Sequence, residues 1–260
     1  MKRLTLTILI GLIWTSTILG QIQNDVKKVL VTKDFVEFKK FADSLTNGDK
    51  RIYSNCECLR DLTFDFQEGV FFFEKWVPTL ENPAIFSDYI FRVNIIATKT
   101  QIVYYELSEK KYKKVFNKSE SYYDLIDKFK DEKLFDSLKI SFRNIFQKEL
   151  NENELFVTDF VYGQYCDIEG AKPIGRKQID KWIAFKNKKK LLNWLKSTNT
   201  EKQVYAVTGL FQLKKKGIKL TEKEMKIIKF VISKNGTISI CLGCIYTNTN
   251  INSVTKKFNF

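Results

Sequence analysis

The hydrophobic pattern changes its period part-way along this chain, and this change limits the fold more than any other feature. Between residues 70 and 116, apolar and aromatic side chains run together or alternate with polar ones, as in β-strands. From Ser121 onward they recur every three or four residues, as in helices. Strands followed by helices, rather than alternating with them, predict an α+β fold. We therefore expect an antiparallel β-meander half followed by an α-helical half.

The strand-like half is expected to hold three or four antiparallel strands. Residues 70–77 suit a strand that is buried on at least one face. Residues 89–97 and 101–107 alternate on either side of the polar segment 98–100, which predicts a β-hairpin. Residues 112–116 are a candidate for a further strand.

Capping signals mark the ends of several predicted helices. Thr200 with Gln203, and Thr221 with Glu224, have the spacing of capping boxes, and Gly217 supplies a left-handed residue after the first of these helices. The predicted helices cover 34–45, 122–129, 138–146, 178–185, 191–195, 200–216 and 222–234. A turn-rich stretch with Cys56 and Cys58 follows the first helix, and a strand at 237–246 follows the last.

One helical segment carries a resemblance to a known family. Residues 191–210, with the sequence LLNWLKSTNTEKQVYAVTGL, resemble one unit of a HEAT-type helical repeat, in which a short helix ends in a polar turn and Glu201 opens the next helix. The family's small or apolar inner positions are filled by Tyr205, Ala206, Gly209 and Leu210. Lys202 stands where an apolar residue is usual, and Gln203 where an arginine is usual. The resemblance implies a HEAT-like helical half, and the alternative is an ordinary helical subdomain. Independently, Leu210 and Phe211 lie on the inner face of their helix, so we expect both to be buried.

The amino terminus has the pattern of a secretory signal peptide at residues 1–20. Lys2 and Arg3 precede an apolar stretch at 4–19, which ends before Gly20 and Gln21. The stretch is short for a membrane span of about 20 residues, so we expect cleavage near Gln21, with an uncleaved anchor as the alternative. The protein is then exported, either periplasmic or secreted, and has no transmembrane span after signal removal.

The rest of the chain divides into two predicted regions. Residues 21–165 form the α+β region with the antiparallel sheet, and residues 166–260 form a helical region that ends in a Cys-x-x-Cys strand. The length fits either one large domain or two small ones.

The charge balance points to an anionic partner or to solubility. The formal net charge is +14, and lysine supplies almost all of the excess. Lysine runs at helix ends stay solvated and complement the helix dipole, whereas specific phosphate recognition favours arginine. We therefore expect no specific nucleic acid; the partners that remain are another protein or an anionic envelope surface.

The sequence contains no histidine, and this excludes several chemistries together. Ser-His and Cys-His nucleophilic pairs, histidine general bases and histidine zinc sites all require it. Asp159, Asp167 and Glu169 lie near a glycine-rich turn and could act as paired carboxylates, but acidic turn residues more often cap or stay solvated. We predict a non-enzymatic binding or structural protein of the cell envelope or extracellular space, with no catalytic residue, cofactor or metal.

The cysteines are the remaining chemical signal. Cys56 and Cys58 form one close pair, Cys241 and Cys244 form another, and Cys166 lies between them. In an exported protein we expect structural disulfides, and we favour a bridge from Cys166 to Cys241 or Cys244; the alternative partner is the region of Cys56 and Cys58. Free thiols, a thiolate site for zinc or copper(I), and a redox pair are the alternatives. The alternative function is therefore thiol-based redox or metal handling by Cys241 and Cys244.

Overall fold

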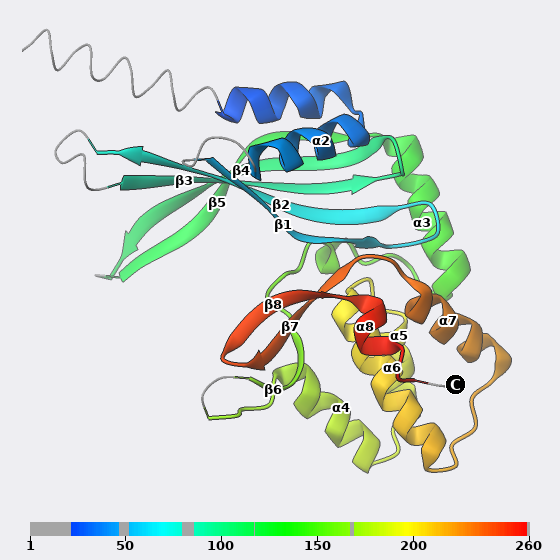
Figure 1. The fold of residues 1–260 in the computed structure, drawn as a ribbon. Helices are drawn as coiled ribbons and strands as arrows, with labels where there is room; N and C mark the ends of the chain where they lie inside the picture. The colour runs from blue at the N-terminus through cyan, green and yellow to red at the C-terminus, as the bar shows by residue number, and fades with distance from the viewer. Residues whose placement is uncertain (1–21, 47–51, 80–85, 117, 167–168, 259–260) are drawn as a thin grey trace, which may run out of the picture. The chain divides into compact units, whose positions relative to one another are not determined.

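The computed structural model describes residues 22–46, 52–79, 86–116, 118–166 and 169–258 (Figure 1). A five-stranded antiparallel sheet precedes most of the helices, so the predicted α+β fold is confirmed. The chain forms two compact units: unit 1 is Met1–Cys56 with Val70–Asp131, and unit 2 is Glu57–Gly69 with Glu132–Phe260. The first hairpin of the sheet is shared, because its tip, residues 57–69, belongs to unit 2.

Unit 1 is built on the sheet, and its strands follow one another in space in chain order. They are β1 (Ile52–Asp61), β2 (Gln67–Pro78), β3 (Phe86–Ala97), β4 (Ile102–Val115) and β5 (Lys118–Lys130). The predicted hairpin is confirmed as β3 and β4, which pair from Ala97 opposite Ile102 to Phe91 opposite Glu109.

Helices cover one face of this sheet. A helix at 22–32 and α2 (Phe35–Thr46) run along that face (Figure 1). Phe38 of α2 packs edge-on against Phe71 and Phe73 of β2, with ring centroids 5.0 and 6.2 Å away. Since neighbouring side chains of a strand point to opposite faces, Phe72 lies on the face opposite α2. We call this the far face.

The helix predicted at 122–129 is wrong, because these residues belong to strand β5. The register of β5 against β4 shifts between Leu107 and Ser108, which is a β-bulge. An extra residue in a strand moves the following side chains to the other face. The bulge therefore places Tyr122 and Phe129 on one face. In a regular strand, residues seven positions apart would point to opposite faces. A helix gives the same spacing, and the pattern is read correctly only when the partner strand is known.

The stretch around Cys56 and Cys58 is also a strand, not a set of turns. Apart from the buried Arg60, its polar residues lie at exposed or half-buried positions of β1, so its sequence lacks the apolar alternation that marks a strand. Pairing with the neighbouring β2 supplies the backbone hydrogen bonds that the local sequence does not signal.

Unit 2 contains most of the helices and a second, three-stranded sheet. Its helices are α3 (Glu132–Phe146), η1 (Glu152–Glu154), α4 (Ile174–Ala184), α5 (Lys188–Leu195), α6 (Thr200–Lys215), α7 (Glu222–Ser233) and α8 (Ile251–Thr255). Its strands are β6 (Tyr162–Cys166), β7 (Thr237–Gly243) and β8 (Ile245–Asn250), in the order β6-β7-β8. The predicted strand at 237–246 is thus two strands. They turn at Gly243, whose φ of 59° suits glycine.

The helix ends agree with the sequence at α7 and differ at α6. The predicted capping box of Thr221 and Glu224 is confirmed, with both reciprocal hydrogen bonds present. At α6 the N-cap is Asn199 rather than Thr200, and its side chain accepts from the Lys202 N–H at 2.9 Å. Thr200 and Asn199 are both good capping residues. The Gln203 side chain does not complete the predicted box with Thr200, because it donates to the Ser197 carbonyl at 2.6 Å.

One residue of α6 is less buried than predicted. Leu210 is fully buried as expected, but Phe211 is partly exposed and packs its ring 5.2 Å from that of Phe258. Leu191 of α5 packs against Gly209, where an added Cβ would lie 2.5 Å from a leucine methyl carbon. The likeness of residues 191–210 to a HEAT unit stays a prediction.

Within the described residues, none of the helices has the length and apolar character needed to cross a membrane. The signal-like segment at 1–20 lies outside these residues.

Candidate functional site

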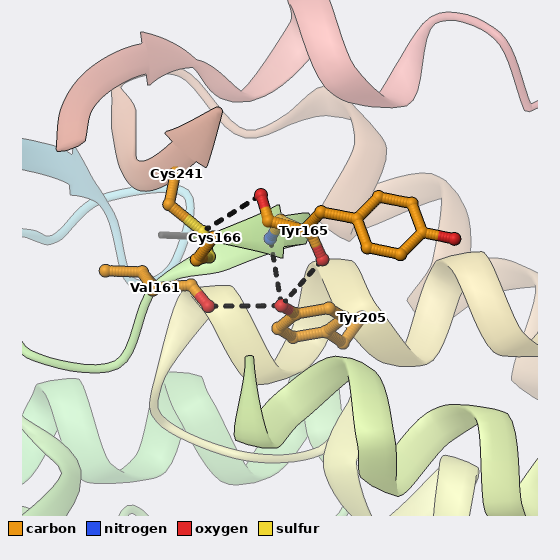
Figure 2. The surroundings of a disulfide bond; sticks show 6 residues. Val161, Tyr165, Cys166, Tyr205 and Cys241 are labelled. Atoms are coloured by element: carbon orange, nitrogen blue, oxygen red, sulfur yellow. Dashed lines mark hydrogen bonds between the residues drawn. A yellow bond between two sulfur atoms is a disulfide. The ribbon is translucent and has the colours of Figure 1, made fainter. Parts of the chain in front are cut away.

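A disulfide bond joins Cys166, the last residue of β6, to Cys241 in β7 (Figure 2). The two α-carbons are 5.5 Å apart, and both residues are buried. This is one of the two pairings that the sequence favours. The parallel pairing of β6 with β7 places Gly163 opposite Cys241, where an added Cβ would lie 2.5 Å from the cysteine sulfur. Glycine at this position therefore leaves room for the bridge.

Tyr205 of α6 fixes the backbone beside the bridge (Figure 2). Its hydroxyl accepts a hydrogen bond from the Gly163 N–H at 2.9 Å, and it lies 3.1 Å from the carbonyl oxygens of Val161 and Gly163. Burial raises the pKa of Tyr205, so the hydroxyl stays protonated and able to donate. The hydrogen bonds of Tyr205 thus join α6 to the small sheet beside the disulfide.

The other cysteines lie at two different places in the chain. Cys56 is exposed and Cys58 is buried, both on β1, whereas Cys244 is exposed at the turn between β7 and β8. Because Cys241 is bonded to Cys166, the Cys-x-x-Cys motif does not form a disulfide of its own. Across the described ranges, no group of three or more cysteine, aspartate or glutamate side chains could hold a metal ion.

The structure describes two of the three acidic residues that were considered as paired carboxylates. Asp159 and Glu169 are exposed to solvent. Asp167 lies outside the described residues.

A buried ion cluster in unit 2 was not anticipated from the sequence. Arg60 donates from Nε to Glu68 at 2.7 Å and from Nη1 to Glu201 at 2.5 Å, and all three side chains are buried. Glu68 also accepts from the Phe156 N–H at 3.0 Å, and Glu201 from the Ser239 N–H at 3.1 Å. The cluster joins the tip of the first hairpin to α6 and β7. It is a structural element, because solvent does not reach it.

Lys234, just after α7, lies near this cluster and is itself buried. Its ammonium nitrogen is 5.7 Å from the ring centroids of both Phe146 and Phe230. Within the described residues this nitrogen has no hydrogen-bond partner. Burial and the nearby Arg60 lower the pKa of Lys234 to about 7.

On the far face of the sheet in unit 1, Arg92 lies beside two neighbouring aromatic rings. Its guanidinium carbon is 5.9 Å from the ring centroid of Phe72 and 5.5 Å from that of Tyr123. Its Nε donates to the Asn94 side chain at 2.9 Å. The ring of Tyr123 therefore continues a cationic and aromatic surface from β3 across to β5.

The carboxylate of Glu106 belongs to the same hydrogen-bond network as Asn94 and is paired with neighbouring groups of that network. Glu106 accepts from Asn94 at 3.3 Å, from Lys128 at 3.2 Å and from the Tyr104 hydroxyl. Burial alone would raise the pKa of Glu106, but these hydrogen bonds and the charge of Lys128 outweigh it and lower the pKa. The carboxylate is thus held ionised and already paired.

The β4–β5 hairpin extends beyond the register of β3. In the described part of the sheet, β3 pairs with β4 as far as Phe91 opposite Glu109, whereas β4 pairs with β5 as far as Val115 opposite Lys118. Figure 1 shows this end of the hairpin diverging from β3. We call residues 110–116 and 118–123 the arm.

The two sides of the arm differ in charge. Opposed residues of an antiparallel pair share a face, and successive residues alternate. The side continuous with the far face carries Lys110, Tyr112, Lys114, Ser119, Ser121 and Tyr123. The other side carries Lys111, Lys113, Val115, Lys118, Glu120 and Tyr122. The first side is basic and aromatic without an acidic residue, and the second side mixes both signs of charge.

Aromatic side chains of the arm are exposed to solvent. The exposed fractions are 54% for Tyr112, 39% for Tyr123 and 99% for Phe116. Phe116 follows the last residue of β4 and has a φ of 46°, which is unusual for a residue other than glycine. Large apolar side chains exposed together beside cations commonly mark an interaction surface.

In comparisons with protein families, with curated proteins and with solved structures, nothing matches this chain. The candidate site therefore depends on geometry alone. The signal for the arm was present in the sequence as Lys110 to Phe116, where lysines surround an aromatic residue. It was missed because the partner strand, β5, was predicted to be a helix.

Proposed function

We propose that this is an exported, non-enzymatic protein that binds an anionic surface through the basic, aromatic side of the arm. One observation carries this proposal: Lys110 and Lys114 share a face with Tyr112 and Tyr123, and no acidic residue of the arm lies on that face. Cations without a protein counter-ion attract an anionic partner, and neighbouring aromatic side chains add apolar contact area.

Export is supported by the signal-like residues 1–20 and by the bridge between Cys166 and Cys241. Disulfides persist in oxidising compartments outside the cytosol. Mass spectrometry of the protein from its native host should find an amino terminus at or near Gln21. A mature chain that retains residues 1–20 would contradict cleavage.

The thiol-based alternative is not the function that we propose. Its two thiols were to be Cys241 and Cys244, and the bond from Cys241 to Cys166 leaves them without a shared disulfide.

Retention on heparin-agarose tests whether the arm is an anion-binding surface. The double variant Lys110→Gln/Lys114→Gln should elute at clearly lower salt than the parent protein, because ionic contacts weaken as salt screens them. The control is Lys39→Gln/Lys40→Gln, which makes the same change of charge at exposed positions of α2. This control should elute close to the parent. Equal shifts for both pairs would mean that net charge alone causes retention, and the proposal would be wrong.

A further inference from the structure

We infer that the anionic surface is a lipid membrane, and that the arm docks on it with Phe116 inserted among the headgroups of anionic lipids. This inference rests on the proposed function and names its partner.

Phe116 occupies the place that membrane insertion requires. It follows the paired part of the arm and is 99% exposed, so its ring is almost entirely open to solvent. A phenylalanine held in water at such a position has an unfavourable hydration free energy, which is relieved when the ring enters the boundary between headgroups and acyl chains. A soluble polyanion offers no such apolar layer.

The side chains behind Phe116 follow the layers of a bilayer surface. Along a strand each residue advances about 3.3 Å, so Lys114 lies about 3 Å and Tyr112 about 10 Å behind Val115, the last residue of β4 before Phe116. An inserted apolar group reaches about 5–10 Å into the headgroup boundary. Lys114 is then at the level of the phosphates, and Tyr112 is at the outer interface, where tyrosine is enriched.

The charge of the arm suits an anionic membrane rather than a neutral one. Lysines near the negatively charged surface of a bilayer add favourable electrostatic energy that falls off within a Debye length. Lys110 and Lys114 lie on the side without acidic residues, and Lys118 stands opposite Val115 at the end of the arm. An ammonium group on a flexible stem can contact lipid phosphates without the fixed geometry that arginine imposes.

Vesicle flotation tests the inference, with phosphatidylcholine vesicles compared with vesicles that also contain phosphatidylglycerol. The parent protein should float with the anionic vesicles and should dissociate from them at high salt. It should not bind the neutral vesicles. Phe116→Ser should weaken partitioning into anionic vesicles by about tenfold, the effect of losing a partly buried phenylalanine. The matched control is Phe185→Ser, which changes another exposed phenylalanine, 76% exposed at the end of α4, and should partition like the parent.

A second readout reports insertion directly. The fluorescence of the tryptophan added in Phe116→Trp is obtained by subtracting the spectrum of the parent. On anionic vesicles this fluorescence should shift to shorter wavelength, and brominated lipids should quench it. Flotation of Phe116→Ser equal to that of the parent, or an indole that stays in water, would overturn the inference.

The failure of this inference can be separated from failure of the proposed function. If Lys110→Gln/Lys114→Gln weakens heparin retention while the parent ignores anionic vesicles, the arm binds soluble polyanions, and only the membrane assignment is wrong. If the double variant changes neither heparin retention nor flotation, both proposals are wrong.

Discussion

Arg60 and Glu201 form a buried ion pair although 141 residues separate them in the sequence. Arg60 comes from the tip of the first hairpin, and Glu201 from the first turn of α6. Arg60 also binds Glu68, and the attraction of both carboxylates outweighs the effect of burial, so the pKa of Arg60 is raised. Charged groups removed from water therefore join the hairpin tip to the rest of unit 2.

Replacing Arg60 should be strongly destabilising. Arg60→Met leaves Glu68 and Glu201 buried without their cation, and breaking a buried pair in this way costs about 3–5 kcal/mol of unfolding free energy. Urea denaturation measures the loss. Arg143→Met is the control, because the pair of Arg143 with Glu149 is exposed and should contribute less than about 1 kcal/mol.

A double variant tests whether Arg60 and Glu201 stabilise each other. Arg60→Met/Glu201→Met removes one buried charge of each sign, so its cost should be smaller than the sum of the costs of the two single variants. Additive costs would mean that the two side chains do not stabilise each other.

Lys234 should make stability rise with pH above neutrality. Its folded-state pKa is about 7, below the ordinary 10.5. Between these values the unfolded chain binds a proton that the folded chain does not, so the unfolding free energy increases with pH, by up to about 1.4 kcal/mol per pH unit. Below this window Lys234 is protonated in both states and adds no pH dependence.

Denaturation series at about pH 7 and about pH 9 measure this slope. Lys234→Met should flatten it, because the methionine has no proton to lose and can keep the contacts with Phe146 and Phe230. Lys229→Met makes the same change at an exposed position of α7 and should keep the slope. A parent and a Lys234→Met variant with equal slopes would show that Lys234 titrates normally.

The bridge between Cys166 and Cys241 should be a large contributor to stability. It closes a loop with a sequence separation of 75, and removal of such a disulfide costs about 2–5 kcal/mol. Cys166→Ser should therefore lower the denaturation midpoint, and Cys241→Ser should lower it by a similar amount. Cys244→Ser, at an exposed position, should leave it almost unchanged. Mass spectrometry after thiol alkylation would contradict the pairing if Cys166 and Cys241 were labelled without reduction.

Leu210 and its neighbour Phe211 should differ in their contribution to stability. Leu210 is fully buried, and Leu210→Ala should cost about 2–5 kcal/mol, as other buried leucine truncations do. Phe211 is partly exposed, so Phe211→Ala should cost less. If urea denaturation showed a larger loss of unfolding free energy for Phe211→Ala than for Leu210→Ala, the observed burial of the two side chains would be contradicted.

The local signals in the sequence located most elements correctly. The box of Thr221 and Glu224 and the left-handed Gly217 appear in the structure where the sequence places them. Such signals act between residues a few positions apart, so a single sequence contains all the information that they need.

Elements that depend on a distant partner were harder to predict. The strand β5 was mistaken for a helix because a bulge against β4 gives its apolar residues a helical spacing. Similarly, β1 has almost no strand pattern of its own. The binding side of the arm was missed for the same reason, since it is defined by which residues of β5 stand opposite Lys110 and Lys114.

The sequence by itself determined the fold class, the capping box that opens α7 and the residues available for chemistry, because these follow from period, capping and composition. Tertiary structure alone decided that Cys166 bonds to Cys241, that Arg60 is buried with Glu68 and Glu201, and that the lysines of the arm share a face with its tyrosines. The physical reason is that pairing energies depend on groups brought together from distant parts of the chain. A charged residue looks the same in a sequence whether it will be solvated or buried beside a partner.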